Sequence, residues 1–283
     1  MGFPPRRTRT ARCERSEEVP LGDNEGKPCS PKCVQLMRVG VFDSGVGGLT
    51  VVKSLLDHQL FEEIIYFGDT ARVPYGVKDK NTIIRYSLEA LEFFKNFEID
   101  LLITACNTVS AYALDELKEN APFDVVGVVE PGILALENTI EDKNSNILII
   151  GTKATINSRA YEKPLITNRY CNISACATGL FVPIVEEGLY KGEVLHSTID
   201  HYFNDLEHPD AIILGCTHFP LIDEAMSDYF KGNTQLIHSG EAIVEYLEHH
   251  YDFSKRFPKT ELKLFASENP EALRAVAKKW LDL

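Results

Sequence analysis

Arg38-Val-Gly-Val-Phe-Asp-Ser-Gly-Val-Gly-Gly48 is an apolar run followed by a glycine-rich loop, and it sets the pattern for the rest of the chain. The run Val39–Phe42 has the length of a strand. The loop is superficially like a phosphate-binding turn, but its glycine spacing is not GxGxxG and no Lys-Ser/Thr pair follows. We therefore expect Gly45, Gly47 and Gly48 to let the backbone approach a small anionic ligand at the start of a helix.

The same alternation of short apolar runs and amphipathic stretches continues to the C-terminus. The further candidate strands are Ile64–Phe67, Leu101–Thr104, Val125–Val128, Ile147–Ile150, Ile173–Ala175, Ala211–Leu214, Leu236–His238 and Leu262–Phe265. Candidate helices between them include Asn81–Phe97, Ser110–Glu119, Gly192–Phe203, Glu241–His250 and Pro270–Leu281. This alternation predicts an α/β fold with a mainly parallel sheet flanked by helices, which binds ligands beyond the carboxyl ends of its strands.

Two cysteines occupy equivalent places in a weak internal repeat. Cys106 follows the apolar run Leu101–Thr104 and precedes Asn107-Thr108, and Cys216 follows Ala211–Leu214 and precedes Thr217-His218. Structural cysteines are usually surrounded by apolar neighbours, whereas these two have polar ones. The repeat favours two similar lobes that each offer one thiol, although chance similarity between two buried strands would give the same pattern.

Composition excludes some classes of function. The 283 residues carry a formal net charge of −13, which argues against a nucleic-acid binder. The apolar runs are too short for a membrane span, and the seven cysteines fit reduced thiols in a cytoplasm better than a disulfide framework. Residues 1–36 lack apolar periodicity, and we expect them to form a disordered extension before Met37.

Other candidate site residues each have an ordinary structural explanation. Asp43 ends the first strand and is either a helix cap or a carboxylate that serves the site. The turn Val73-Pro74-Tyr75-Gly76 could bind a carboxylate through its backbone N–H groups. Thr152 and Thr155 follow the fifth strand, where one threonine could simply cap a helix. Glu186 and its neighbour Glu187 would by default lie on a solvated helix face.

Taken together, these motifs resemble the glutamate racemase family of the aspartate/glutamate racemase superfamily. The resemblance extends from Met37 to Leu283 and rests on Val41–Gly48, Arg72–Gly76, Ala105–Thr108, Glu130–Gly132, Gly151–Thr155 and Gly215–Pro220. It implies two α/β lobes with the active site in the cleft between them. We expect residues 37–133 and 243–283 to form lobe one, and residues 134–242 to form lobe two.

The resemblance also implies an activity and its residues. The family interconverts L- and D-glutamate by proton transfer between two thiols, uses neither cofactor nor metal, and supplies D-glutamate for peptidoglycan synthesis. The implied catalytic residues are Cys106, Cys216, Asp43, His218 and Glu186. The implied substrate-binding residues are Asp43, Ser44, Pro74, Tyr75, Gly76, Asn107, Thr108, Thr152, Thr155, Thr217 and His218. A homodimer in a bacterial cytoplasm is implied as well, with a small-molecule substrate and no nucleic-acid or membrane partner.

The chemistry explains why such a site needs a pair of thiols. Inversion of an α-carbon removes a proton from one face and returns a proton to the other, so two opposed groups are needed. Thiols combine adequate basicity with availability near neutral pH. Hydrogen-bond donors such as Ser44, Asn107, Thr108 and Thr217 would stabilise the developing carbanion, and His218 is expected to hold a proton beside Cys216.

Three alternatives stay open on the sequence alone. A racemase of a related amino acid such as aspartate would use the same pair of thiols. A two-lobed binding protein would bind glutamate without catalysing exchange. A cysteine hydrolase would pair Cys216 with His218, but residues at i and i+2 do not face each other on a helix, and this spacing argues against a hydrolase.

Overall fold

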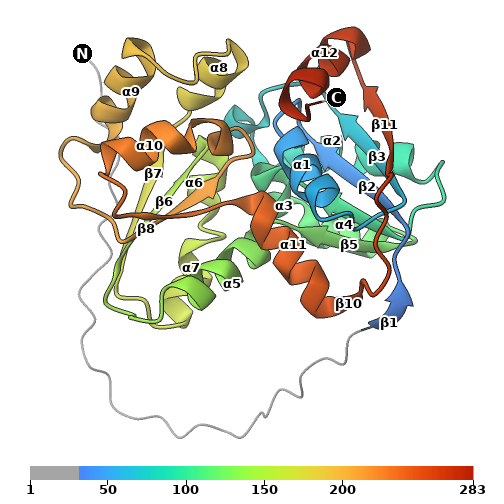
Figure 1. Ribbon diagram of the computed structural model, residues 1–283, viewed down its shortest axis with the longest axis horizontal. Helices are drawn as coiled ribbons and strands as arrows, with labels where there is room; N and C mark the ends of the chain where they lie inside the picture. The colour runs from blue at the N-terminus through green and yellow to red at the C-terminus, as the bar shows by residue number, and fades with distance from the viewer. Residues whose placement is uncertain (1–31, 283) are drawn as a thin grey trace, which may run out of the picture.

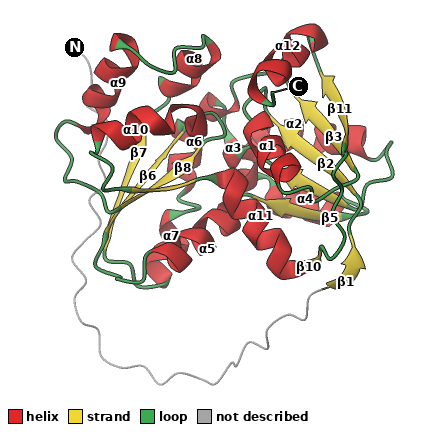
Figure 2. Ribbon diagram, viewed as in Figure 1, coloured by secondary structure: helices red, strands yellow, loops and turns green. Residues whose placement is uncertain are grey.

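The computed structural model describes residues 32–282 and contains two lobes, each built on a fully parallel sheet (Figures 1 and 2). The larger sheet has the order β11-β3-β2-β4-β5. Its strands are β2 (Arg38–Asp43), β3 (Glu63–Gly68), β4 (Leu101–Thr104), β5 (Asp124–Gly127) and β11 (Glu261–Ala266). The smaller sheet has the order β7-β6-β8-β9. Its strands are β6 (Asn146–Gly151), β7 (Asn172–Ala177), β8 (Ala211–Gly215) and β9 (Gln235–Ile237). The expected α/β fold with two similar lobes is confirmed.

Helices cover both faces of each sheet (Figure 2). The helices from the first half of the chain are α1 (Leu49–Asp57), α2 (Lys80–Phe94), α3 (Asn107–Tyr112), α4 (Leu114–Asn120) and α5 (Val129–Thr139). Those from the second half are α6 (Lys153–Ser158), α7 (Glu162–Thr167), α8 (Phe181–Glu186), α9 (Glu193–Phe203), α10 (Asp223–Tyr229), α11 (Ser239–His250) and α12 (Pro270–Trp280). The described residues also contain two 3₁₀ helices, η1 (Tyr75–Val77) and η2 (Phe219–Ile222).

Alternating side chains along each strand build a separate core on each face of its sheet. On β2, Val39 and Val41 pack with residues of α1, α11 and α12. Phe42 points to the opposite face and packs with residues of α2, α3 and α4. The strands of the smaller sheet divide their side chains in the same way. Because both faces are buried, these strands read as continuous apolar runs, which is why they stand out in the sequence.

Two glycines let the loop after β2 pack tightly against its neighbours. A Cβ atom on Gly47 would lie 2.3 Å from Oγ1 of Thr217 in the other lobe, and one on Gly48 would lie 2.6 Å from Cβ of Asp43 in the same lobe. Both distances are far below a normal contact, so larger residues would push the loop away. The expectation that Gly45, Gly47 and Gly48 let the backbone approach an anionic ligand stays a prediction.

The structure corrects two expectations about local structure. The expected helix Ser110–Glu119 is two helices, because Ala113 has φ −123° and ψ 0°, outside the helical region. The expected disordered extension lies mostly outside the described residues. Its last part is not disordered, because Lys32–Gln35 forms β1, which pairs in parallel with β10 (Tyr251–Asp252). A partner so distant in the chain leaves no signal in local periodicity.

The segment that follows β9 returns to the larger sheet. Strand β11 lies beside β3, and α11 packs against both α1 and α5, so the segment after the smaller sheet joins the first lobe's strands. The boundaries at residues 133/134 and 242/243 stay predictions. None of the helices between residues 32 and 282 is both long and apolar enough to cross a bilayer.

Candidate active site

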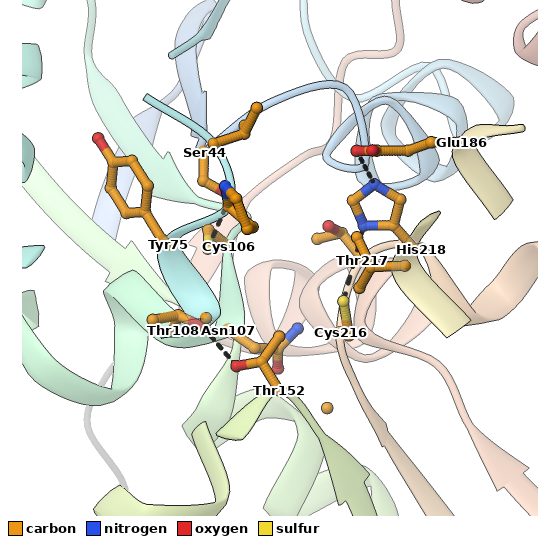
Figure 3. Close-up of a pocket in the computed structure, with 15 residues that line it drawn as sticks. Ser44, Tyr75, Cys106, Asn107, Thr108, Thr152, Glu186, Cys216, Thr217 and His218 are labelled. Atoms are coloured by element: carbon orange, nitrogen blue, oxygen red, sulfur yellow. Dashed lines mark hydrogen bonds and ion pairs between the residues drawn. The ribbon is translucent and has the colours of Figure 1, made fainter. Parts of the chain in front are cut away.

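A pocket lies where the carboxyl ends of the two sheets face each other (Figure 3). The space between its lining atoms, part of it open to solvent, is about 410 Å³. Residues that follow β2, β3 and β4 line one side, and residues that follow β6 and β8, together with α8, line the other. The lining consists of Ser44, Val73, Pro74, Tyr75, Gly76, Cys106, Asn107, Thr108, Thr152, Val182, Glu186, Gly215, Cys216, Thr217 and His218.

Cys106 lies on the side formed by the larger sheet, directly after β4 and at the start of α3. Its Sγ is 3.4 Å from Oγ of Ser44, and the residue is only 6% exposed. Burial, together with the negative charge of nearby Asp43, raises the pKa of the Cys106 thiol to about 12. The thiol therefore holds its proton at neutral pH.

Asp43 is completely buried, and its negative charge acts on Cys106. Its carboxylate accepts hydrogen bonds from the backbone N–H of Gly45 at 2.9 Å and from Oγ1 of Thr217 at 3.4 Å. Burial raises the pKa of Asp43, and the positive charge of His218 opposes that rise. The carboxyl group thus connects the end of β2 to the residues that follow β8.

Cys216 lies on the opposite side of the pocket, beside an imidazole and a carboxylate (Figure 3). Its Sγ is 3.6 Å from Nδ1 of His218, and Nε2 of His218 is 3.1 Å from Oε1 of Glu186. Burial would lower the pKa of His218, but the hydrogen bonds with Cys216 and Glu186 outweigh it and raise this pKa to about 10. His218 is therefore protonated at neutral pH and can donate to both partners.

Three threonine hydroxyl groups form hydrogen bonds between the two lobes beside the pocket. Oγ1 of Thr108, from α3, lies 2.9 Å from Oγ1 of Thr152 and 3.0 Å from Oγ1 of Thr155. Thr152 is the residue that caps α6. Thr152 faces the pocket, whereas Thr155 is 1% exposed and does not line it. Thr155 therefore supports the other two hydroxyls from behind.

The side chain of Tyr75 points away from the other residues that line the pocket (Figure 3). Its hydroxyl donates to Oδ2 of Asp69 at 2.5 Å, and Asp69, itself fully buried, also accepts hydrogen bonds from Arg72 and Ser267. This network fixes the turn that contains Pro74 and Gly76. Any contact of Tyr75 with a ligand would come from its backbone rather than its hydroxyl.

Twelve of the residues predicted from sequence line one pocket, namely Ser44, Pro74, Tyr75, Gly76, Cys106, Asn107, Thr108, Thr152, Glu186, Cys216, Thr217 and His218. Asp43 and Thr155 do not line it, so the expectation of a direct ligand contact for these two is not supported. Val73, Val182 and Gly215 also line the pocket and were not among the residues predicted from sequence. Val73 and Gly215 belong to motifs already recognised, and Val182 lies one helical turn before Glu186.

One argument from spacing does not hold. The sequence argued against a Cys216–His218 hydrolase because i and i+2 residues do not face each other on a helix. The two residues lie instead in the turn between β8 and η2, where Sγ and Nδ1 are 3.6 Å apart. The spacing therefore gives no reason to reject a Cys–His hydrolase, and that alternative must be judged on other observations.

Comparisons with known proteins identify relatives over nearly the whole chain. A family model described as Asp/Glu/Hydantoin racemase matches residues 50–247. The glutamate racemase of a Nitratiruptor species is 66% identical over 245 residues, which cover 87% of this chain and 96% of the relative. The crystal structure of glutamate racemase from Campylobacter jejuni subsp. jejuni is 55% identical, with a TM-score of 0.85, and the match covers 87% of this chain and 99% of that chain. The glutamate racemase of Francisella tularensis subsp. tularensis, solved in complex with D-glutamate, is 32% identical, with a TM-score of 0.76 and coverage of 88% and 95%.

Proposed function

This chain belongs to the Asp/Glu/hydantoin racemase family, and we propose that it interconverts L- and D-glutamate by moving the α-proton between Cys106 and Cys216. One observation supports this mechanism above the others. Two buried thiols, one from each lobe, line the same small pocket from opposite sides (Figure 3). Glutamate held between them could lose its α-proton to the thiolate on one side, and the flat carbanion so formed could take a proton from the thiol on the other side.

The surroundings of the two thiols suit opposite roles at the start of a turnover. Cys106 carries its proton, because its pKa is raised to about 12. Cys216 lies 3.6 Å from Nδ1 of His218, an imidazole that is positively charged at neutral pH. Cys106, which holds its proton, is therefore assigned as the acid of this turnover, and Cys216 is assigned as the base. After one turnover Cys216 holds the proton and Cys106 lacks it. The enzyme then either catalyses the reverse reaction or regains its starting protonation before the next turnover in the same direction.

The carbanion needs hydrogen-bond donors that are already in place. The hydroxyl groups of Ser44, Thr108 and Thr217 and the amide of Asn107 all line the pocket. Apart from Ser44, each of these is at most 4% exposed. Because water is largely excluded, a hydrogen bond to the substrate carboxylate is stronger there than on the surface. These residues therefore supply the stabilisation that a cofactor would otherwise provide.

Further properties are proposed on family membership alone. They are independence from metals and organic cofactors, a homodimeric assembly, a cytoplasmic location and the supply of D-glutamate for peptidoglycan synthesis. Dialysis against EDTA should leave the turnover rate unchanged if the first of these is correct. A loss of activity that returns on adding a divalent cation would contradict it.

The direct test follows the α-proton by NMR in D₂O. We expect the purified protein, without added cofactor, to incorporate deuterium at Cα of both L- and D-glutamate while each enantiomer converts to the other. A binding protein would show no exchange, and a hydrolase would release a product instead of inverting the carbon. Parallel samples with L- and D-aspartate measure specificity, and faster turnover of aspartate than of glutamate would contradict the proposed substrate.

A further inference from the structure

The amide of Asn107 can face the pocket in two ways. Asn107 is the first residue of α3, is 2% exposed and lines the pocket beside Cys106. An asparagine side chain presents an oxygen that accepts or a nitrogen that donates two hydrogen bonds. Only the nitrogen can bind the carboxylate of an amino-acid substrate. Whatever determines the direction of this amide therefore determines whether Asn107 attracts or repels the substrate.

A chain of hydrogen bonds sets that direction. It starts at the backbone carbonyl oxygen of Leu214, which can only accept. Oγ of Ser239 lies 3.5 Å from this oxygen and donates to it, so Oγ is left to accept from Nδ2 of Asn107 at 3.4 Å. Oδ1 of Asn107 in turn accepts from the hydroxyl of Tyr161 at 2.5 Å. Each donor in this chain points the same way, and the second N–H of Asn107 is left for the pocket, toward which Figure 3 shows the amide nitrogen turned.

The Tyr161 side chain is held firmly enough to impose this direction. The residue is 2% exposed, and Cβ atoms placed on Gly132 and Gly215 would come within 3.2 Å and 3.4 Å of its ring carbons. Arg159 and Glu162 form a two-pronged ion pair on either side of it in the chain. Burial also raises the pKa of Tyr161, so its hydroxyl keeps the proton that it donates.

We propose that Tyr161 is a positioning residue, which holds the Asn107 amide so that one N–H donates to a carboxylate of the substrate. Tyr161 precedes α7 in the second lobe, whereas Asn107 belongs to the first. The orientation of a binding group in one lobe is therefore set by a residue of the other, and it is correct only while the lobes are in contact. This inference rests on the proposed function, because it needs a carboxylate ligand in this pocket.

The variant Tyr161→Phe removes only the hydroxyl. We expect the KM for D- and L-glutamate to rise about tenfold, and kcat to change by less than about threefold, because the lost contact is made in the bound ground state. The matched control is Tyr170→Phe. Tyr170 is 3% exposed and donates to the carbonyl oxygen of Ile140 at 2.6 Å, in the same lobe but outside the pocket. This control should lower the melting temperature to a similar extent and leave KM unchanged.

A double variant separates positioning from a structural effect. In an Asn107→Ala background, the further change Tyr161→Phe should leave KM within about twofold, because the amide through which Tyr161 acts is gone. Equal and independent increases of KM in the two backgrounds would overturn the proposal, and so would an unchanged KM in Tyr161→Phe alone. If Tyr161→Phe does not fold, Ser239→Ala breaks the same chain at its other end and should raise KM in the same direction, and an unchanged KM there overturns the proposal.

Calorimetric titration with D-glutamate distinguishes this inference from the proposed function. Should the wild-type protein bind D-glutamate without racemising it, the proposed function fails, and the affinities of the same variants still decide the role of Tyr161. Should the wild type racemise glutamate while Tyr161→Phe binds and turns it over normally, the proposed function stands and the role of Tyr161 is rejected. Absence of both binding and turnover in the wild type would reject both.

Discussion

Cys106 and Cys216 occupy equivalent places in the two lobes but have opposite electrostatic surroundings. Both follow a central strand of a parallel sheet, and both are nearly buried. Beside Cys106 lies the carboxyl group of Asp43, whereas Cys216 contacts His218, which Glu186 supports. The similar backbones place two thiols at one pocket, and the different neighbours give the two thiols different electrostatic surroundings. A symmetric reaction is therefore carried out by a site whose two sides differ.

The largest effect on this asymmetry is expected from Asp43→Asn, which keeps the shape of the side chain and removes its charge. The pKa of Cys106 should fall from about 12 toward its ordinary value of 9.0, because repulsion between carboxylate and thiolate disappears. Turnover should fall by about 10², in the range expected for the loss of a group that assists proton transfer. Rates of iodoacetamide alkylation at Cys106, followed by peptide mass spectrometry from about pH 7 to 11, measure the shift.

The same alkylation experiment contains its own reference. Cys176 lies outside the pocket, so its alkylation profile should be identical in the wild type and in Asp43→Asn. An unchanged profile at Cys106 would mean that burial alone sets the pKa of this thiol and that Asp43 serves only to join the lobes.

A smaller effect on turnover, about 10- to 50-fold, is expected from His218→Asn. This variant also changes the dependence of stability on pH. The pKa of His218 is raised from 6.5 to about 10, so the folded protein retains a proton that the unfolded chain releases. The resulting stabilisation is complete below about pH 6.5 and is lost as the pH rises through 10.

Urea unfolding of the wild type and His218→Asn at about pH 6 and pH 10 measures this contribution. The difference in free energy of unfolding between the two proteins should be larger at the lower pH and shrink at the higher pH. A difference that stays constant or grows with pH would show that His218 is neutral in the folded protein, and the contrast between the two thiols would lose one of its causes.

The smallest effect is expected from Glu186→Gln. The Glu186 side chain is 39% exposed, so solvent screens its ion pair with His218. We expect turnover to fall by about two- to fivefold, and the pKa of His218 to fall because one of its hydrogen-bonding partners loses its charge. NMR titration of the His218 ring reports that pKa, and Glu187→Gln on the adjacent residue outside the pocket is the control. A larger loss than in His218→Asn would imply that Glu186 contacts the substrate.

The sequence predicted the parts of the molecule that local patterns encode. Buried parallel strands are continuous apolar runs, so the strands of both sheets could be located, and with them the positions of Cys106 and Cys216 at strand ends. The motif loops follow these strands directly, which explains why twelve predicted residues line a single pocket.

Contacts between distant segments could not be predicted in this way. The hydroxyl of Tyr75 is drawn out of the pocket by Asp69, and Tyr161 reaches Asn107 from the other lobe. The spacing argument against a Cys216–His218 hydrolase fails because a turn replaces the helix that the spacing rule assumed. In each case a three-dimensional arrangement, rather than the character of the residues, decides what the side chain does.

The opposition of the two thiols is tested most directly by α-proton exchange in single-thiol variants. Cys106→Ser and Cys216→Ser are incubated separately with L- and D-glutamate in D₂O, and deuterium at Cα is measured by NMR. Each variant should lose racemisation by at least about 10³-fold, and each should exchange the α-proton of only one enantiomer, with opposite preferences. Exchange of the same enantiomer by both variants, or near-normal racemisation by either one, would contradict the account.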